Sequence, residues 1–153
     1  MEKRYDVLEF YKIVNELIDL SRLENTKEKF LDIDIIKEKS TLDKELMLMG
    51  EMIDFYKYDD GFELAGLSDI QRFMRNVEVI GSYLSSEDLA NLKRNLTIFR
   101  VSKSRAKNVR DKYKNIWQLF ANIEEVKDIE QFIDDAVRED GTLKHDASLG
   151  LRD

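Results

Sequence analysis

The feature that most limits what this chain can fold into is the long stretch from Ser82 to Asp140, which contains neither proline nor glycine. Nothing in it forces the backbone out of helical geometry. Apolar residues recur along it at spacings of three and four, with one interruption near Ser102, as on one face of a long helix. We therefore expect a helix over Ser85–Phe120 of about 54 Å, or a helix pair if the chain breaks near Lys107–Asp111. The residues of this face are Leu89, Leu92, Leu96, Phe99, Ala106, Val109, Tyr113, Ile116 and Phe120.

The composition favours an all-α protein. The chain has no proline, 37% charged residues and 10% aromatic residues, and this aromatic content argues against disorder. At 153 residues it is long enough for one domain with its own core. We predict a single helical domain over residues 1–153, a bundle with one long central helix or helix pair. Further helices are expected over 6–24, 40–58, 68–81 and 126–138, and segment 27–39 stays open between helix and extended chain.

Capping signals mark where some of these helices begin. Ser85 at the N-cap with Asp88 three residues later is the clearest start signal, and Leu84 and Leu89 can form a hydrophobic staple around it. Ser40 is expected to cap the helix that follows it, and Ser68 with Gln71 reads as a capping box. Gly141 is predicted to take a positive φ in the turn after the last helix.

The charge is unevenly distributed. The whole chain carries −7, but the window 93–114 holds nine Lys or Arg against one acid, which leaves the remainder at −15. Spacings of three, four and seven place six of these cations in a stripe along the long helix. The stripe suits contact with the phosphates of a nucleic acid, and it suits equally a solvated helix face that pairs with the acidic body. The candidate nucleic-acid-binding residues are Lys93, Arg100, Lys103, Lys107, Arg110 and Lys114.

The sequence shows no catalytic or metal site. Without cysteine there is no thiolate ligand or nucleophile. The sequence also contains no glycine-rich phosphate-binding loop. The single histidine, His145, stands beside Asp146 and is interpreted as a surface or turn residue. The acid pairs, which lack the spacing of a calcium loop, are interpreted as solvated surface. They are Asp32 with Asp34, Asp59 with Asp60, and Asp134 with Asp135.

No apolar run is long enough to span a membrane, and no signal-peptide core follows the charged start Met1–Asp6. We expect a cytoplasmic protein that does not act on membranes.

Four short segments resemble the second bacterial branch of the MutS proteins, in the order that the family has them. The most specific is the tail 133–148, whose D-G-T-L-K-H-D-A-S turn is similar to the family's D-G-x-[LV]-x-D-x-A-S and is followed by the pair Leu151–Arg152. The others are Leu8–Ile13, which resembles the opening helix, Gly66–Ile70, which resembles a G-L-x-D-I loop, and Leu84–Leu89, which resembles an L-S-x-E-E-L helix start.

The resemblance implies a non-catalytic piece of a larger machine. In this family a helical core leads through lever helices to a clamp and returns to a P-loop ATPase domain, often followed by a small Smr nuclease domain. Residues 1–153 would be the first part of the core and lever domain, with ATP and Mg²⁺ bound elsewhere in the full-length protein. The implied partners are branched or double-stranded DNA or the ribosome, the remainder of its own chain, and a second copy in a homodimer. The implied roles are suppression of recombination and splitting of stalled ribosomes.

The residues also allow a second interpretation, a free-standing helical module that binds a protein partner and meets no nucleic acid. An enzyme in its own right is a distant third, because no catalytic constellation supports it.

Overall fold

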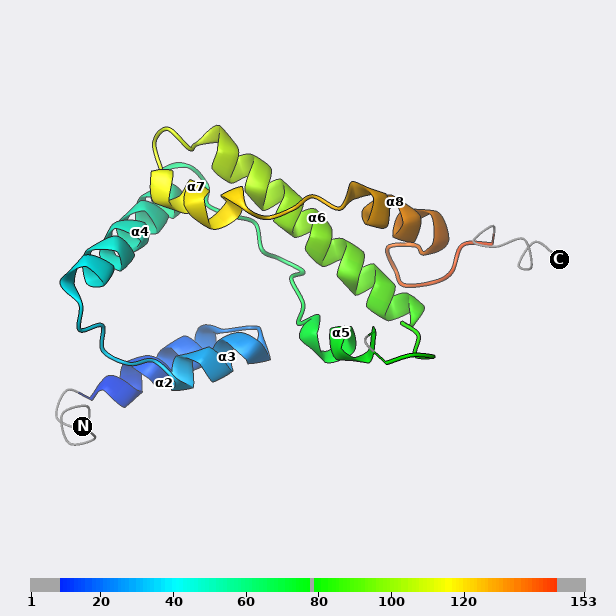
Figure 1. Ribbon diagram of the computed structural model, residues 1–153, viewed down its shortest axis with the longest axis horizontal. Helices are drawn as coiled ribbons and strands as arrows, with labels where there is room; N and C mark the ends of the chain where they lie inside the picture. The colour runs from blue at the N-terminus through cyan, green and yellow to red at the C-terminus, as the bar shows by residue number, and fades with distance from the viewer. Residues whose placement is uncertain (1–8, 78, 146–153) are drawn as a thin grey trace. The chain divides into compact units, whose positions relative to one another are not determined.

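The computed structural model describes residues 9–77 and 79–145, and the chain divides between Lys37 and Glu38 into two compact units. The described secondary structure is helical, apart from one isolated bridge between Val137 and Leu143. The all-α class predicted from the sequence is therefore confirmed (Figure 1).

The first unit is a helical hairpin of α2 (Phe10–Leu20) and α3 (Glu24–Leu31), which pack against each other. The predicted helix over 6–24 is wrong at its C-terminal end, because the chain leaves the helix at Ser21. The segment left open at 27–39 is helical to Leu31 and irregular afterwards. Serine forms helices weakly, and Ser21 ends α2 in extended backbone with φ −79° and ψ 133°. Residues 6–8 lie outside the described part.

The second unit is organised around α6 (Ser86–Asn108), its longest described helix. The chain reaches α6 through α4 (Lys39–Tyr58) and α5 (Gln71–Val77), and continues into α7 (Lys114–Ala121) and α8 (Lys127–Ala136). Helix α6 packs against α7 and α8, and α4 packs against α7. Figure 1 shows α7 and α8 lying along opposite halves of α6.

The expected long helix is a helix pair. The break begins after Asn108, within the region Lys107–Asp111 where the sequence allowed one, and the helix resumes beyond that region, at Lys114. At Tyr113 the backbone has φ −124° and ψ 77°, outside helical values. The break turns α7 back toward α4, so that the apolar residues after Tyr113 join those of α4 instead of continuing along a straight helix.

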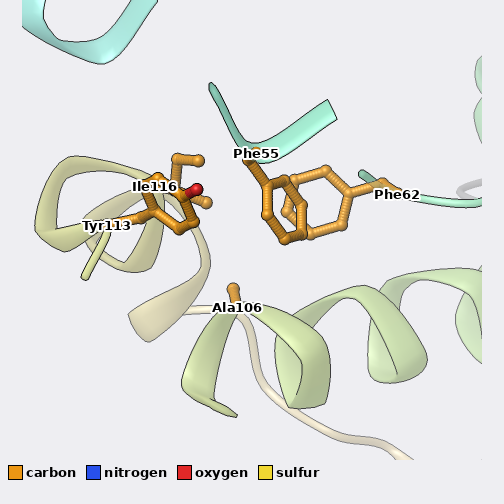
Figure 2. Packing of buried hydrophobic residues seen from close by; sticks show 5 residues of the cluster. All are labelled: Phe55, Phe62, Ala106, Tyr113 and Ile116. Carbon is orange, nitrogen blue, oxygen red and sulfur yellow. The ribbon is translucent and has the colours of Figure 1, made fainter. Parts of the chain in front are cut away.

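The largest core of this unit lies where α4, α6 and α7 meet. Phe55 and Phe62 pack edge to face with ring centroids 4.7 Å apart, and Phe55 and Tyr113 do so at 5.6 Å. Ala106 of α6 and Ile116 of α7 close the cluster and are fully buried (Figure 2). Ala106 matters because a small side chain lets the aromatic rings approach the helix. Five partly buried residues surround the cluster: Leu48, Met52, Val109, Trp117 and Phe120.

A second, smaller core joins the other half of α6 to α8. Ile133 and Val137 are almost fully buried against Ala90. The predicted helix over 126–138 is confirmed as α8, and Gly141 has φ 84° in the turn that follows, as expected. At about 25 cal/mol per Å² of apolar surface removed from water, burial of Ile133 contributes roughly 2 kcal/mol.

The start of α6 confirms the capping box, since Ser85 Oγ accepts from Asp88 N at 3.0 Å and Asp88 accepts from Ser85 N at 3.2 Å. The other two caps are predicted wrongly. Helix α4 begins earlier than Ser40, at a cap made by Glu38, because that longer side chain also reaches Thr41 N. Ser68 bonds to α6 instead of capping α5, and Asp69 accepts from Gln71 N at 3.0 Å.

Candidate phosphate-contact face

The stripe of six predicted cations follows α6 into the α6–α7 loop and the start of α7, and the structure divides it into two groups. Lys93, Arg100 and Lys103 bind other parts of the second unit. Lys107, Arg110 and Lys114 lie around the end of α6 and the start of α7 and are exposed. Pairing within the chain therefore describes the first group, whereas the charge of the second group is left exposed to solvent.

Arg100 makes the strongest contact of the first group. Its Nε lies 3.0 Å from Glu130 Oε1, and its Nη2 lies 3.1 Å from Glu130 Oε2, a two-pronged geometry. Thr97 Oγ1 donates to the same carboxylate at 3.1 Å. Glu130 is only 8% exposed, so this charge on α8 is compensated by partners on α6. The hydrogen bond with Glu130 raises the pKa of Arg100, which keeps the guanidinium charged.

Lys93 and Lys103 complete this attachment on either side of Arg100. Lys93 forms an ion pair with Asp134, and the hydrogen bond with Lys93 lowers the pKa of Asp134. Lys103 Nζ donates to the backbone carbonyl of Ile123 at 2.5 Å, in the segment between α7 and α8. All three cations thus hold the chain that follows α7 against α6, which is a structural role that occupies their charge.

The second group is available to solvent. Within residues 9–77 and 79–145, no ion pair is found for Lys107 or Lys114. Arg110 approaches Asp111 at 3.9 Å, with both side chains more than half exposed, so this pair is worth little. We call Lys107, Arg110 and Lys114 the corner cations. An anion that approached them would displace water and one weak ion pair.

Sequence reasoning missed the side chains that position this corner. Asp59, at the end of α4, accepts from Lys112 Nζ and from the Tyr113 hydroxyl, each at 2.5 Å. The hydrogen bond with Lys112 lowers the pKa of Asp59, and the same bond raises the pKa of Lys112. Burial is the main cause that raises the pKa of Tyr113. Because Asp59 binds two consecutive residues just before α7, it fixes the end of the loop that carries Arg110.

Glu51 is a second residue whose role the sequence did not predict. It lies on α4 and caps the start of another helix, α7. Its carboxylate accepts from Ile116 N at 3.0 Å and from Asn115 N at 2.8 Å, two backbone donors in the first turn of α7. The start of a helix has unpaired N–H groups and a positive dipole end, both of which favour a carboxylate. A charged residue on the core side of α4, four before Phe55, was the only signal in the sequence.

Asn95 is the third missed residue. It is 1% exposed, and its amide accepts from Ser68 N at 3.0 Å and donates to the Ser68 carbonyl at 2.6 Å. This two-way pairing fixes the loop before α5 on α6. The sequence offered one hint, a polar residue beside Leu96 on a face that the apolar spacing assigns to the core.

A hollow of about 280 Å³ lies between α6 and α8. Ala90, Ile133 and Val137 contribute apolar walls. The cations at its rim are occupied: Arg94 donates to the Glu139 carbonyl at 3.4 Å and Arg138 to the Leu143 carbonyl at 2.8 Å. Backbone carbonyls thus hold both guanidinium groups at the rim of the hollow.

The described residues hold no group of three or more His, Asp or Glu that could bind a metal ion. His145 lies in a turn and is exposed, while Asp146 beside it lies outside the described part. None of the described helices is both long and apolar enough to cross a membrane.

No family model matches this chain. It is 33% identical over 149 residues to endonuclease MutS2 of Fusobacterium nucleatum subsp. nucleatum, an alignment that covers 97% of the chain. The same alignment covers 19% of the relative, so the chain spans about a fifth of the length of the curated protein that it matches. The similarity supports a relation to MutS2, in agreement with the resemblance of the four sequence segments. Of those segments, Leu8, residues 146–148 and the pair Leu151–Arg152 lie outside the described part.

Proposed function

We propose that this chain is a non-catalytic helical core segment of a MutS-like clamp ATPase that acts on branched DNA or on stalled ribosomes in the cytoplasm. The observation that carries the proposal is the similarity of nearly the whole chain to a fifth of endonuclease MutS2. The complete protein would bind ATP and Mg²⁺, act as a homodimer and, as the relative's name indicates for that protein, cleave nucleic acid. The segment itself would connect movements of the remaining chain.

We expect ATP and Mg²⁺ to bind elsewhere in the complete protein. The sequence has six glycines but no phosphate loop, and the described residues form no metal-binding group. What they supply is mechanical connection. Asn95, Glu130 and Asp59 each join elements that are at least 27 residues apart in the sequence. Movement of α6 would therefore carry α8, the loop before α5 and the end of α4 with it.

Within this function, we assign the phosphate contact to the corner cations. Lys107, Arg110 and Lys114 have exposed charge, whereas Lys93, Arg100 and Lys103 are engaged inside the second unit. Three phosphate contacts on duplex DNA predict a slope of log K against log salt of about −2.7 from this face. Contacts of this kind would position DNA without reading its sequence.

The function is tested by exchange. This chain replaces the matching segment of the Fusobacterium MutS2, and binding of the chimaera to a four-way DNA junction and to ribosomes is measured by salt titration. Retained binding of either ligand supports the segment role and names the target. A soluble, folded chimaera that has lost both activities would contradict it.

The corner cations are tested in the same chimaera by the triple change Lys107→Glu, Arg110→Glu and Lys114→Glu. We expect binding to weaken and the salt slope to fall by about 3. Lys29→Glu, Lys37→Glu and Lys44→Glu form a matched control, because they change the net charge equally at exposed sites outside the three corner cations. If both triples weaken binding alike, general charge and not this face is responsible.

A free-standing interaction module is the second candidate, and the exposed apolar side chains of α4 favour it. Leu46 and Met49 are 60% and 59% exposed, and neither belongs to the core clusters. Under this function the chain alone would be stable and soluble, and the exchange into MutS2 would abolish junction and ribosome binding.

A further inference from the structure

The C-terminal end of α4 lies beside the loop that carries Arg110. Asp59, the residue that follows α4, binds Lys112 and Tyr113, which immediately precede α7. Glu51, earlier in α4, caps the first turn of α7, and the two helices pack against each other (Figure 1). The surface at the corner is therefore formed by two elements, the segment that joins α6 to α7 and the last turn of α4.

Tyr58, the last residue of α4, presents an aromatic ring at this surface. It follows Glu51 by seven residues, about two helical turns, so both side chains lie on the same edge of α4. Glu51 shows that this edge faces the start of α7. Tyr58 is 64% exposed, and within residues 9–77 and 79–145 its one recorded contact is with the neighbouring Lys57.

The contact with Lys57 places a positive charge beside the ring. Lys57 Nζ lies 5.1 Å from the centroid of the Tyr58 ring, within the range of a cation–π contact. An ammonium group over one face of a ring leaves the opposite face for a second flat group. The ring thus combines an accessible face with a cation that attracts negatively charged ligands.

Further cations lie on the other side of this surface. The segment 105–114 holds five Lys or Arg against one acid. The two acids that follow α4 are already paired, Asp59 with Lys112 and Asp60 with Arg105 at 3.8 Å. The corner cations therefore give this surface its positive charge.

A flat ring beside exposed cations fits a nucleotide. The phosphate would meet the cations, and the base would stack on the ring, a contact open to every base because each has a π-face. An acidic peptide would satisfy the cations but leave the ring without a stacked partner. In a continuous duplex each base is covered on both faces by its neighbours. The ring can therefore stack only on a base that is unpaired, as at a branch point, a gap or a bulge.

We propose that Tyr58 stacks on an unpaired base of the nucleic acid whose phosphates meet the corner cations. This inference rests on the function proposed above and deepens it, because it names the feature that this face selects, an unpaired nucleotide in preference to a continuous duplex. Phosphate contacts alone position a nucleic acid without such a selection. Stacking tolerates any base, so the selection is by structure and not by sequence.

The test compares two DNA probes that share one strand and have identical ends. The first is a continuous duplex, and in the second a few central adenines lack partners and form a bulge. The continuous duplex carries more phosphates, so charge alone would favour it. Binding of the 153-residue chain is measured by fluorescence anisotropy at about 50 mM salt. We expect the bulged probe to bind about tenfold more tightly.

Variants of Tyr58 show whether its ring causes the preference. Tyr58→Ala should reduce the ratio of the two affinities to about one, and Tyr58→Phe should restore it because the ring is kept. Tyr83→Ala is the matched control, since Tyr83 is 87% exposed and precedes α6, at the opposite end of that helix from the corner. A ratio of about one in the unchanged chain overturns the proposal, and so do equal effects of the two alanine variants.

Photocrosslinking tests the stacking contact directly. The bulged probe is made with 5-iodouracil in place of an adenine, irradiated in complex with the chain, and the crosslinked residue is identified by mass spectrometry. This base crosslinks to an aromatic side chain that stacks on it, so we expect the product at Tyr58. A main product at any other residue overturns the assignment.

The same two probes made of RNA distinguish the two sources of an unpaired nucleotide. A preference for the bulge in DNA indicates branched DNA as the ligand, and a preference in RNA indicates the ribosome. Absence of a preference in both overturns the stacking. A chain that binds no probe overturns the phosphate contact as well, whereas the exchange into MutS2 tests the segment role separately. Failure of the stacking and failure of the proposed function therefore give different results.

Discussion

The two halves of α6 are attached to their neighbours by different kinds of contact. The C-terminal half joins α4 and α7 through an apolar cluster centred on Phe55 and Ile116, both fully buried. The N-terminal half joins α8 and the loop before α5 mainly through Asn95 and Glu130, together with a cluster of three buried apolar residues. We call these the aromatic end and the polar end.

This difference predicts that the two ends contribute unequally to the stability of the fold. Burial of an aromatic ring is favourable whatever the orientation of its neighbours, and it is worth more than a hydrogen bond whose partners were hydrated before folding. Polar contacts specify geometry, because an unsatisfied buried group is penalised. We infer that the aromatic end supplies most of the stability and that the polar end fixes where α8 and the loop lie.

The largest expected effect is that of Phe55→Ala, which removes the ring at the centre of the aromatic end. We expect unfolding to become easier by about 3–5 kcal/mol, the usual range for a buried phenylalanine. Trp117, the chain's single tryptophan, packs on this cluster and reports the transition by fluorescence in urea.

Ile133→Ala is the counterpart at the polar end, where about 2 kcal/mol is expected, the low end of the range for isoleucine. An equal or larger loss from Ile133→Ala would contradict the inequality between the two ends.

Asn95→Ala tests the attachment of the loop before α5. The change leaves the Ser68 backbone N–H and carbonyl without their partner, so we expect a loss of about 1–3 kcal/mol. Amide hydrogen exchange should rise first in the loop around Ser68 and stay unchanged in α7. Asn91→Ala on the same helix, where the native side chain only accepts from Arg94 Nη1 at 3.2 Å, should have little effect.

Glu130→Gln tests the ion pair of the polar end. The substitution keeps the shape but removes the charge that faces Arg100. The expected loss is about 1 kcal/mol, because the Arg100 side chain is 35% exposed and retains some water. A double-mutant cycle with Arg100→Met isolates the pair from the lost packing of each side chain.

Glu124→Gln, at an exposed site in the segment before α8, is the control for general charge effects. A zero coupling energy in the cycle would show that Arg100 and Glu130 are neighbours without mutual stabilisation.

The smallest effect is the pH dependence at Asp59. Its pKa is lowered in the folded protein, mainly by Lys112, so its contribution is present above the ordinary pKa of 3.8 and is lost as pH falls through the lower folded value. The pKa values of Lys112 and Tyr113 are raised, so their contributions are present below 10.5 and 10.0 and are lost as pH rises through the higher folded values.

Urea titrations across this range should therefore show stability falling at both extremes, and Asp59→Asn should weaken both dependences. If Asp59→Asn leaves the alkaline dependence unchanged, the Lys112 contact does not contribute to stability.

The fold was largely predictable because helix formation follows local rules. The spacing of apolar residues placed α6, α7 and α8, and the Ser85 box marked the start of α6. The exact position of the break at Tyr113 was harder to predict from the sequence. It depends on the carboxylate of Glu51, which comes from another helix and caps the start of α7. Ser68 was assigned to a cap because its competing partner, Asn95, is 27 residues away.

The candidate site was predictable only as a set of charges. The spacing identified six cations on one stripe, but it could not tell which of them meet an acid from another helix. Lys93 and Arg100 meet α8, while Lys107 and Lys114 lie beyond its reach at the corner. Whether one of these cations meets an acid is decided by the path of the chain after α7.

The sequence by itself determined that this protein is helical, where its longest helix begins, and that its basic residues gather on one part of an acidic chain. These properties depend on side-chain type and on spacings within a few turns. The tertiary structure decided that α7 folds back toward α4 and which cations stay free. It also decided the contacts that Glu51, Asp59 and Asn95 make with distant segments of the chain. Those outcomes depend on contacts between residues far apart in the chain, and such contacts exist only once the helices have packed.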